Sequence, residues 1–294
     1  MEIFNSNFWW IFSTAVFIAI PSALLGCFLI LRKMAMIGDA ISHAVLPGIV
    51  VAYLMTSSYN SFPMLIASAL VGILCTFLIE TFNKIGRLQE DASIGVTYTW
   101  LFAIGVVMIS FFNDNLDLDQ DCVLFGEIAY VPLDSIELFQ DIFIPKAFLT
   151  GFIMMTIIVL VILFFYNGFK ITSFDPLYAA SIGISLSLVN YTLMSLVSFV
   201  TVFSFESVGA ILVLAFMVVP PATAYLVSTD LKKMMKLSCL FAVHGVFWGY
   251  LLSVQLNSSI AGAMATTLGI QFFLIFILHL LAKKKKYNVL PQSK

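Results

Sequence analysis

The stretch MIGDAISHAVLPG, residues 36–48, places two ionisable side chains, Asp39 and His43, four positions apart. In a helix this spacing stacks both side chains on one face. A carboxylate and an imidazole nitrogen are suitable ligands for a borderline divalent ion such as zinc, manganese or iron. The same two groups could instead relay a proton, and their spacing does not separate the two chemistries. Because two ligands are too few for a closed metal site, other helices or water would have to supply the rest.

The elements that must position this pair are membrane spans. Hydrophobic residues make up 61% of the chain and charged residues only 10%, with a mean hydropathy of +1.06. A soluble globular protein has fewer hydrophobic and more charged residues, so this composition indicates an integral membrane protein. The alternating short segments of a β-barrel are absent from the sequence. The opening MEIFNSNFWW has no basic region and no small-residue cleavage site after it, so we expect the first apolar run to remain as a span.

Apolar runs between polar breaks predict nine spans, each long enough to cross about 30 Å of hydrocarbon. If one run is short or re-entrant, the count falls to eight. The predicted fold class is therefore all-α, a polytopic transmembrane helical bundle of eight to nine spans. The runs cover residues 9–31, 36–56, 63–83, 92–112, 145–166, 178–203, 207–228, 237–256 and 259–281.

The basic residues support this count and give an orientation. Of 14 Lys and Arg residues, only Lys146 falls outside the segments that follow odd-numbered runs. By the positive-inside rule these segments are cytoplasmic, which predicts the N terminus outside and the C terminus inside. The residues concerned are Arg32, Lys33, Lys84, Arg87, Lys170, Lys232, Lys233, Lys236, Lys283, Lys284, Lys285, Lys286 and Lys294.

The longest polar segment, residues 113–144, carries acidic residues and no basic one, and is predicted to be extracytoplasmic. The electric field of such a group of negative charges raises the local cation concentration near the entrance of a pathway. The alternative is a solvated loop whose carboxylates only keep it out of the bilayer. Its acidic residues are Asp114, Asp117, Asp119, Asp121, Glu127, Asp134, Glu137 and Asp141.

The predicted depth of the ionisable pair favours a functional role. Counting about 1.5 Å per residue from Arg32 places Asp39 roughly 10 Å and His43 about 16 Å into the membrane. A charge at that depth costs on the order of 3 kcal/mol, so it normally faces a partner, a cavity or a pathway. Pro47 and Gly48 follow within a turn and can break the span. Alternatively, Asp39 begins the span, favoured by the helix dipole, with His43 bonded to a neighbouring carbonyl.

A capping pattern marks the segment after the fifth apolar run, TSFDPLYAASIG. Asp175 before Pro176 can cap a short helix, whose first position tolerates proline. The small side chain of Ala179 and its neighbours would let that helix dock closely in a groove. The plainer interpretation is an ordinary capped connection into the sixth span.

The seventh run, SVGAILVLAFMVVPPATA, combines Gly209 with a double proline inside a span. Pro220 and Pro221 remove helix hydrogen bonds and favour a bend, which could serve as a gate. Prolines are also common in transmembrane helices without any such role.

Two further residues are candidate metal ligands. Glu206, at the outer edge of the seventh run, could add a carboxylate to the entrance, or be an interfacial residue in water. His244, in the middle of the eighth run, could add an imidazole, or simply bond across to another helix.

Four segments together resemble one family. LILRKMAMIGDAISHAVLPGIVVAYL is similar to the most recognisable segment of the integral membrane permeases of ATP-binding-cassette importers for manganese, zinc and iron. CVLFGEI (122–128), FDPLYAASIGI (174–184) and SVGAILVLAFMVVPPATAYLV (207–227) follow in the family's order. The resemblance spans about residues 10–280.

The resemblance implies a bacterial inner-membrane protein in which two permease chains, the same or related, form the pathway. A separate cytoplasmic ATPase and an extracytoplasmic metal-binding protein complete the importer. Asp39 and His43 correspond to residues that contact the ion in transit. The segment about 167–180 corresponds to the loop that seats on the ATPase, with Phe174, Asp175, Pro176, Ala179 and Gly183 as its motif residues.

The predicted function is thus the permease subunit of a divalent metal importer, with residues 1–294 as one transmembrane domain and a basic cytoplasmic tail at 282–294. No phosphate-binding loop G-x-x-x-x-G-K-[ST] occurs in the sequence, so we expect ATP hydrolysis on the partner subunit and no enzymatic activity here. A proton-coupled carrier that uses Asp39 and His43 as its relay is the main alternative. A membrane-embedded metal hydrolase is disfavoured by the few polar groups at that depth.

Overall fold

The computed structural model describes residues 6–56, 61–112, 127–139 and 142–289. Within these ranges, nine helical segments are long and apolar enough to cross a membrane, which confirms the all-α class and the predicted count. Eight of them are continuous helices. They are α1 (Ser6–Leu31), α4 (Ser61–Lys84), α5 (Glu90–Phe111), α7 (Lys146–Phe174), α9 (Leu186–Val208), α10 (Ala210–Val227), α11 (Leu231–Leu256) and α12 (Ile260–Val289).

The second span is broken into α2 (Ile37–Ala44) and α3 (Leu46–Thr56), as Pro47 and Gly48 predicted. Pro47 has no N–H to donate to the carbonyl one turn before it, so the helical hydrogen-bond ladder is interrupted here. A Cβ on Gly48 would lie 2.7 Å from the Ala67 carbonyl oxygen, so the glycine lets α3 approach the backbone of α4. The break therefore separates the short helix that carries Asp39 and His43 from the rest of its span.

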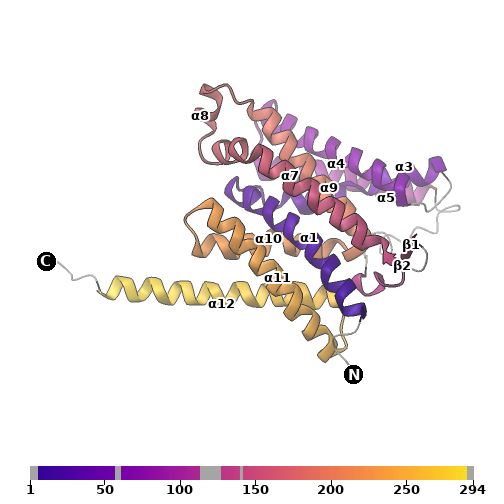
Figure 1. Cartoon of the computed structure of the whole chain (residues 1–294). Helices are drawn as coiled ribbons and strands as arrows, with labels where there is room; N and C mark the ends of the chain where they lie inside the picture. Colours follow the sequence, from indigo (N-terminus) through magenta and orange to yellow (C-terminus); the bar gives the residue numbers. More distant parts are fainter. Residues whose placement is uncertain (1–5, 57–60, 113–126, 140–141, 290–294) are drawn as a thin grey trace.

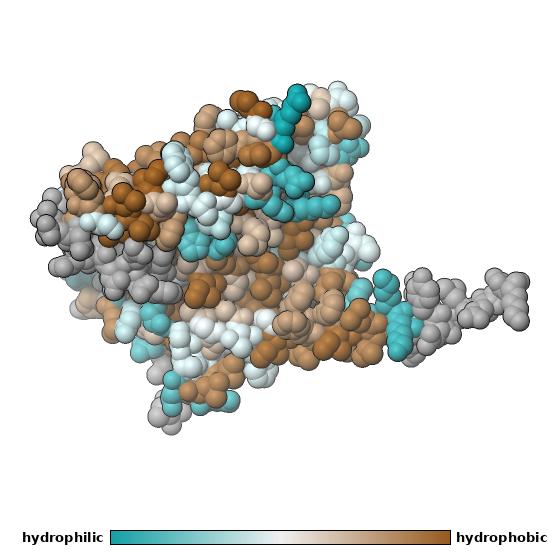
Figure 2. Space-filling view, turned by 180° about the vertical axis from the view of Figure 1, so that it is seen from behind, coloured by the Kyte–Doolittle hydropathy of each residue, from teal (hydrophilic) through white to brown (hydrophobic). Residues whose placement is uncertain are grey.

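The most enclosed spans are the first and the second. In each of them, 67% of the most apolar 18-residue stretch is buried, compared with 17% in α12 and 22% in α7. α1 packs against α7, α9, α10 and α11, whereas α2 packs against α4, α5, α9 and α10. On the face seen in Figure 2, most of the surface between the two ends of the bundle is apolar. The second span is therefore an interior element, which suits a helix that carries ionisable groups.

The two ends of the bundle differ in structure (Figure 1) and in the charged residues that their segments carry. One end, the basic face, carries the segments with Arg32, Lys84, Lys170 and Lys233, together with the short helix α8 (Pro176–Ser181). The start of α1 and the end of α12 lie at opposite ends, as an odd number of spans requires. Which end faces the cytoplasm stays a prediction from the basic residues.

The opposite end, the acidic face, contains an element that the sequence did not predict. Residues 113–126 lie outside the described ranges. After them come the short 3-10 helix η2 (Ile128–Tyr130) and an antiparallel pair, β1 (Ser135–Phe139) and β2 (Ile142–Pro145), with Ser135 opposite Pro145. The later part of the acidic segment is thus a hairpin rather than a plain loop.

Two boundaries on the basic face also differ from the expectation. α7 continues to Phe174, eight residues beyond the predicted end of its span. The hydroxyls of Thr172 and Ser173 donate to the Gly168 and Phe169 carbonyls one turn earlier, so these polar residues are accommodated in the helix. α12 continues to Val289, so the basic tail begins as helix.

Candidate functional site

The ionisable pair occupies one face of α2. His43 Nε2 lies 3.6 Å from Asp39 Oδ1. The other six residues of this helix are buried, whereas the Asp39 and His43 side chains are 35% and 41% exposed. Asp39 is in the first turn of this helix and His43 in the last. The predicted shared face is confirmed.

Aromatic side chains of α5 border the pair. The His43 ring centroid lies 5.5 Å from that of Phe102, edge to face, and 6.1 Å from that of Tyr98. These contacts hold the imidazole beside the carboxylate. Across the described ranges, no group of three or more His, Cys, Asp or Glu side chains is arranged to hold a metal ion. Asp39 and His43 are therefore two neighbouring polar groups on a partly open face.

The buried side of α2, the helix that carries the pair, packs closely against α10. A Cβ on Gly38 would lie 2.8 Å from the Met217 sulfur, and one on Gly26 would lie 1.9 Å from the Met217 carbonyl oxygen. That carbonyl receives no helical hydrogen bond from Pro221, which has no N–H. Gly26 thus lets α1 approach the bare carbonyl. The seventh-span motif therefore supports the pair from behind, through Met217.

The candidate gate residues lie in and before α10. Both prolines, Pro220 and Pro221, are inside the helix and do not end it. Gly209 separates α9 from α10 with φ 77° and ψ 161°, a conformation that only glycine adopts easily. The change of direction between the two spans is therefore located at Gly209.

The structure does not bring the candidate ligand His244 to the pair. His244 is exposed on α11, with its ring centroid 6.1 Å from that of Trp248 on the same helix. α11 packs mainly against α1, α10 and α12 rather than α2. Glu206 is in the last turn of α9, and its side chain is outside the described part of the structure.

The capped helix predicted around Asp175 is confirmed. Asp175 Oδ1 accepts a hydrogen bond of 2.9 Å from the Tyr178 N–H, and Pro176 occupies the first turn of α8. The helix ends at Ser181, and Gly183 follows with a φ of 83°, while the Ile184 N–H donates to the Ala179 carbonyl at 3.0 Å. Ala179 is fully buried. Each end of α8 is thus specified by a residue of the FDPLYAASIG motif.

Comparison with known proteins identifies the family. The sequence profile of the ABC 3 transport family matches residues 6–279. The chain belongs to this family.

Relatives of this ABC 3 protein share most of its length. It is 43% identical over 268 residues to the manganese transport system membrane protein MntD of Bacillus subtilis, covering 91% of this chain and 90% of MntD. It is 38% identical to the zinc transport system membrane protein TroD of Treponema pallidum, covering 90% of this chain and 71% of TroD.

A solved structure also matches the fold of this ABC 3 protein. The structure is PsaBC from Streptococcus pneumoniae in complex with Fab, with a TM-score of 0.73 and 29% identity, covering 92% of this chain and 91% of that chain.

Arg32, one of the basic residues that indicate the orientation of the spans, links two parts of this ABC 3 protein. Arg32, at the end of α1, donates from Nε to Ser173 Oγ at 3.0 Å and from Nη2 to Thr172 Oγ1 at 2.7 Å. Its Nη1 donates to Asn190 Oδ1 on α9. The guanidinium thus joins the segment that leads into α2 to the last turn of α7, just before α8.

Apolar side chains are exposed on α8 and its flanks, although the helix lies on the polar basic face. Leu177 is 84% exposed, and Phe174, Tyr178 and Ile182 are also exposed. In Figure 1, α8 extends beyond the ends of most spans. An apolar patch in that position is typical of a surface that binds another protein.

Proposed function

We propose that the chain is the membrane-spanning permease subunit of an ATP-binding-cassette importer that moves a divalent transition metal ion into the cytoplasm. The observation that carries the proposal is the Asp39–His43 pair, half-exposed on a broken interior span of an ABC 3 family member. Manganese and zinc are the ions in the names of the relatives, and iron is compatible with the same ligands. The transported ion is the substrate, and no resident cofactor is proposed.

Two permease chains, the same or related, complete the site. The pair is open on one face, so a second pair facing it would bring two carboxylates and two imidazoles to one ion. The distance of 3.6 Å between His43 Nε2 and Asp39 Oδ1 is longer than a hydrogen bond, so neither atom uses its lone pair on the other. Incomplete coordination suits a carrier, because the ion has to leave again.

Energy and delivery come from other chains in this proposal. A cytoplasmic ATPase binds the exposed apolar surface of α8, the coupling helix, and hydrolyses ATP at its own nucleotide site. Arg32 transmits the movement of α8 to the segment before α2. Gly209, Pro220 and Pro221 let α9 and α10 change direction when the pathway switches from one side of the membrane to the other. An extracytoplasmic metal-binding protein delivers the ion at the acidic face. The permease itself is not an enzyme.

The location follows from the same scheme. The protein spans the bacterial inner membrane many times, with the basic face in the cytoplasm, the N terminus outside and the C terminus inside. Residues 1–294 act as a single permease domain, with the acidic segment 113–144 outside and the basic tail 282–294 inside.

Uptake of radioactive manganese and zinc tests the proposal. Cells express the chain with its ATPase and binding protein, and wild type is compared with Asp39→Ala and His43→Ala at equal membrane levels. Asp91→Ala and His279→Ala remove exposed groups of the same kinds elsewhere and serve as matched controls. We expect uptake to fall at least tenfold in the two site variants only, since each loses half of the ligands from its chain.

Two results would overturn the proposal. Full uptake in both site variants would remove the pair from the pathway. Uptake that continues without the ATPase and collapses with the proton gradient would instead support a proton-coupled carrier.

A further inference from the structure

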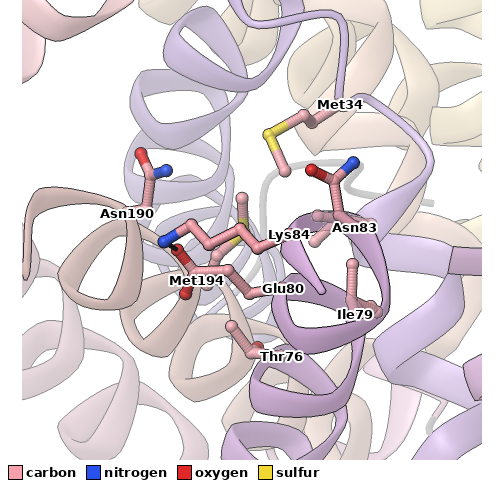
Figure 3. Close-up of a pocket in the computed structure, with 9 residues that line it drawn as sticks. Met34, Thr76, Ile79, Glu80, Asn83, Lys84, Asn190 and Met194 are labelled. Carbon is pink, nitrogen blue, oxygen red and sulfur yellow. Dashed lines mark hydrogen bonds and ion pairs between the residues drawn. The ribbon is translucent and has the colours of Figure 1, made fainter. Parts of the chain in front are cut away.

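A polar pocket lies on the basic face, between the segment before α2, the inner end of α4 and the first turns of α9 (Figure 3). Its volume is about 90 Å³. Ile37, the first residue of α2, lines this pocket and lies two positions before Asp39. Closely packed side chains leave a helix no room to shift, whereas free space beside one end of a helix lets that end move. The pocket therefore gives the start of α2, and Asp39 with it, room to move.

Two side chains on the first turns of α9 bond to α4 at this pocket. Glu80, on α4, is only 12% exposed, and its carboxylate forms an ion pair with Lys84 one turn later (Figure 3). The Lys84 Nζ also donates to Ser187 Oγ of α9 at 2.8 Å. The Tyr191 hydroxyl, also on α9, donates to the Glu80 carboxylate. The ion pair of α4 is therefore shared between the two helices.

A third bond joins the same end of α9 to the end of α1. Arg32 Nη1 donates to Asn190 Oδ1, and the same guanidinium also binds the last turn of α7. Ser187, Asn190 and Tyr191 are spaced i, i+3 and i+4, so they lie on one face of α9. That face is thus tied to α1 and to α4 at the same level, and these bonds hold the helices that surround the start of α2.

The bonded end of α9 is joined to α8 by a short connection. α8 ends at Ser181, Gly183 turns the chain with a φ of 83°, and α9 begins at Leu186. A movement of α8 therefore reaches the first turns of α9 through few residues. The Lys84 side chain is 49% exposed, so water can replace its bond to Ser187 at little cost. The bond between α4 and α9 can thus open when α9 moves.

We propose that Lys84, held in place by Glu80, is a positioning residue for transport. While its bond to Ser187 is closed, α9 and α4 keep the start of α2 in the place seen here. When α8 moves, this bond opens, α9 separates from α4, and the start of α2 shifts into the pocket and carries the Asp39–His43 pair with it. The inference rests on the proposed function, because it assigns a role in the change of access to side chains that do not contact the ion.

Filling the pocket tests this inference. Thr76, on α4, is 5% exposed and lines the pocket. Thr76→Leu places a larger apolar side chain in the free space, so the unfolding temperature of the permease should stay the same or rise. Metal uptake by the assembled transporter should nevertheless fall roughly fivefold or more, because α2 has lost its room to move.

The control for this variant is the same substitution elsewhere on α4. The Thr76 and Thr81 hydroxyls both donate to the carbonyl one turn earlier, but Thr81 does not line the pocket. Thr81→Leu should leave both stability and uptake unchanged. A pocket that is only a packing defect predicts that uptake in Thr76→Leu follows stability, so a loss of uptake without a loss of stability distinguishes the two roles.

Opening the bond between α4 and α9 is the complementary test. Ser187→Ala removes this bond and leaves the Glu80–Lys84 pair intact. In the full-length chain in lipid nanodiscs, the backbone amides of α2 should exchange hydrogen about threefold faster in Ser187→Ala and more slowly in Thr76→Leu. Thr192→Ala removes a hydroxyl that bonds only within α9 and should have no effect. Adding Lys84→Met to Ser187→Ala should give no more than the effect of Lys84→Met alone, since both remove the same bond.

Three results would overturn the inference. They are full uptake in Thr76→Leu, uptake in that variant that falls only together with its unfolding temperature, and α2 exchange that is equal in Ser187→Ala and Thr192→Ala. Failure of the proposed function gives a different result. In that case uptake survives Asp39→Ala and His43→Ala, whereas α2 exchange still changes in Ser187→Ala and Thr76→Leu.

Discussion

Replacing Gly26 by alanine should separate α1 from α10 and weaken both stability and transport. The new Cβ would lie 1.9 Å from the Met217 carbonyl oxygen and 2.7 Å from Pro221 Cγ. Cβ atoms essentially never approach other heavy atoms within 3.0 Å, so the two helices have to move apart by about 1 Å. Neither contact can be relieved by a flexible side chain, because one is backbone and the other is a proline ring.

The magnitude follows from two opposing effects. Overpacking of this kind costs about 1–3 kcal/mol, and alanine recovers about 0.5–1 kcal/mol because it is a better helix former than glycine. We therefore expect a net loss of about 1–2 kcal/mol in the free energy of unfolding. Since Met217 also contacts Gly38, the displacement reaches α2, and metal uptake should fall together with stability.

A matched glycine gives the control. A Cβ on Gly95, within α5, would meet nothing within 4 Å, so Gly95→Ala should leave stability unchanged or raise it by up to about 1 kcal/mol. Both variants are unfolded by denaturant titration in detergent, and uptake is measured in the same strains. The reasoning is refuted if Gly26→Ala is as stable as Gly95→Ala.

Three further substitutions test the basic face and the candidate gate. Arg32→Lys keeps the charge but cannot reproduce three hydrogen bonds from one planar group; ATP hydrolysis by the assembled transporter should continue while uptake falls several-fold, and equal loss of both activities would contradict a coupling role. Asp175→Ala removes the cap of α8 and should cost about 1 kcal/mol locally, measured as faster hydrogen exchange of Tyr178, with Asp175→Asn retaining most of the protection. Gly209→Ala forces a side chain into a glycine-only conformation and should cost about 1–3 kcal/mol in thermal unfolding; an unchanged unfolding temperature would show that this link is not strained.

Local sequence signals were enough to predict the spans, the break in the second span and the cap of α8. Each depends on residues within a few positions of one another: an apolar run, Pro47 with Gly48, or Asp175 before Pro176. The shared face of Asp39 and His43 follows from helix geometry in the same way. These features depend on the backbone and on residues that are close in sequence, so they can be predicted from a single sequence.

Features that depend on distant partners were not predicted. Arg32 bonds to side chains 140, 141 and 158 positions away, and no local pattern connects them. The end of α7 was placed too early because hydropathy stops at the polar residues, whereas the helical hydrogen bonds continue through them.

The exposure of the Asp39–His43 face is itself an argument for a second chain. Both side chains are more than a third exposed, yet α2 is otherwise buried and belongs to one of the two most enclosed spans. If lipid covered that face, a carboxylate at this depth would cost on the order of 3 kcal/mol with no compensating contact. A facing copy of the same pair, with water or an ion between them, supplies that compensation and the missing ligands together. In the proposed pair of permease chains, the open face and the incomplete set of ligands therefore have the same explanation.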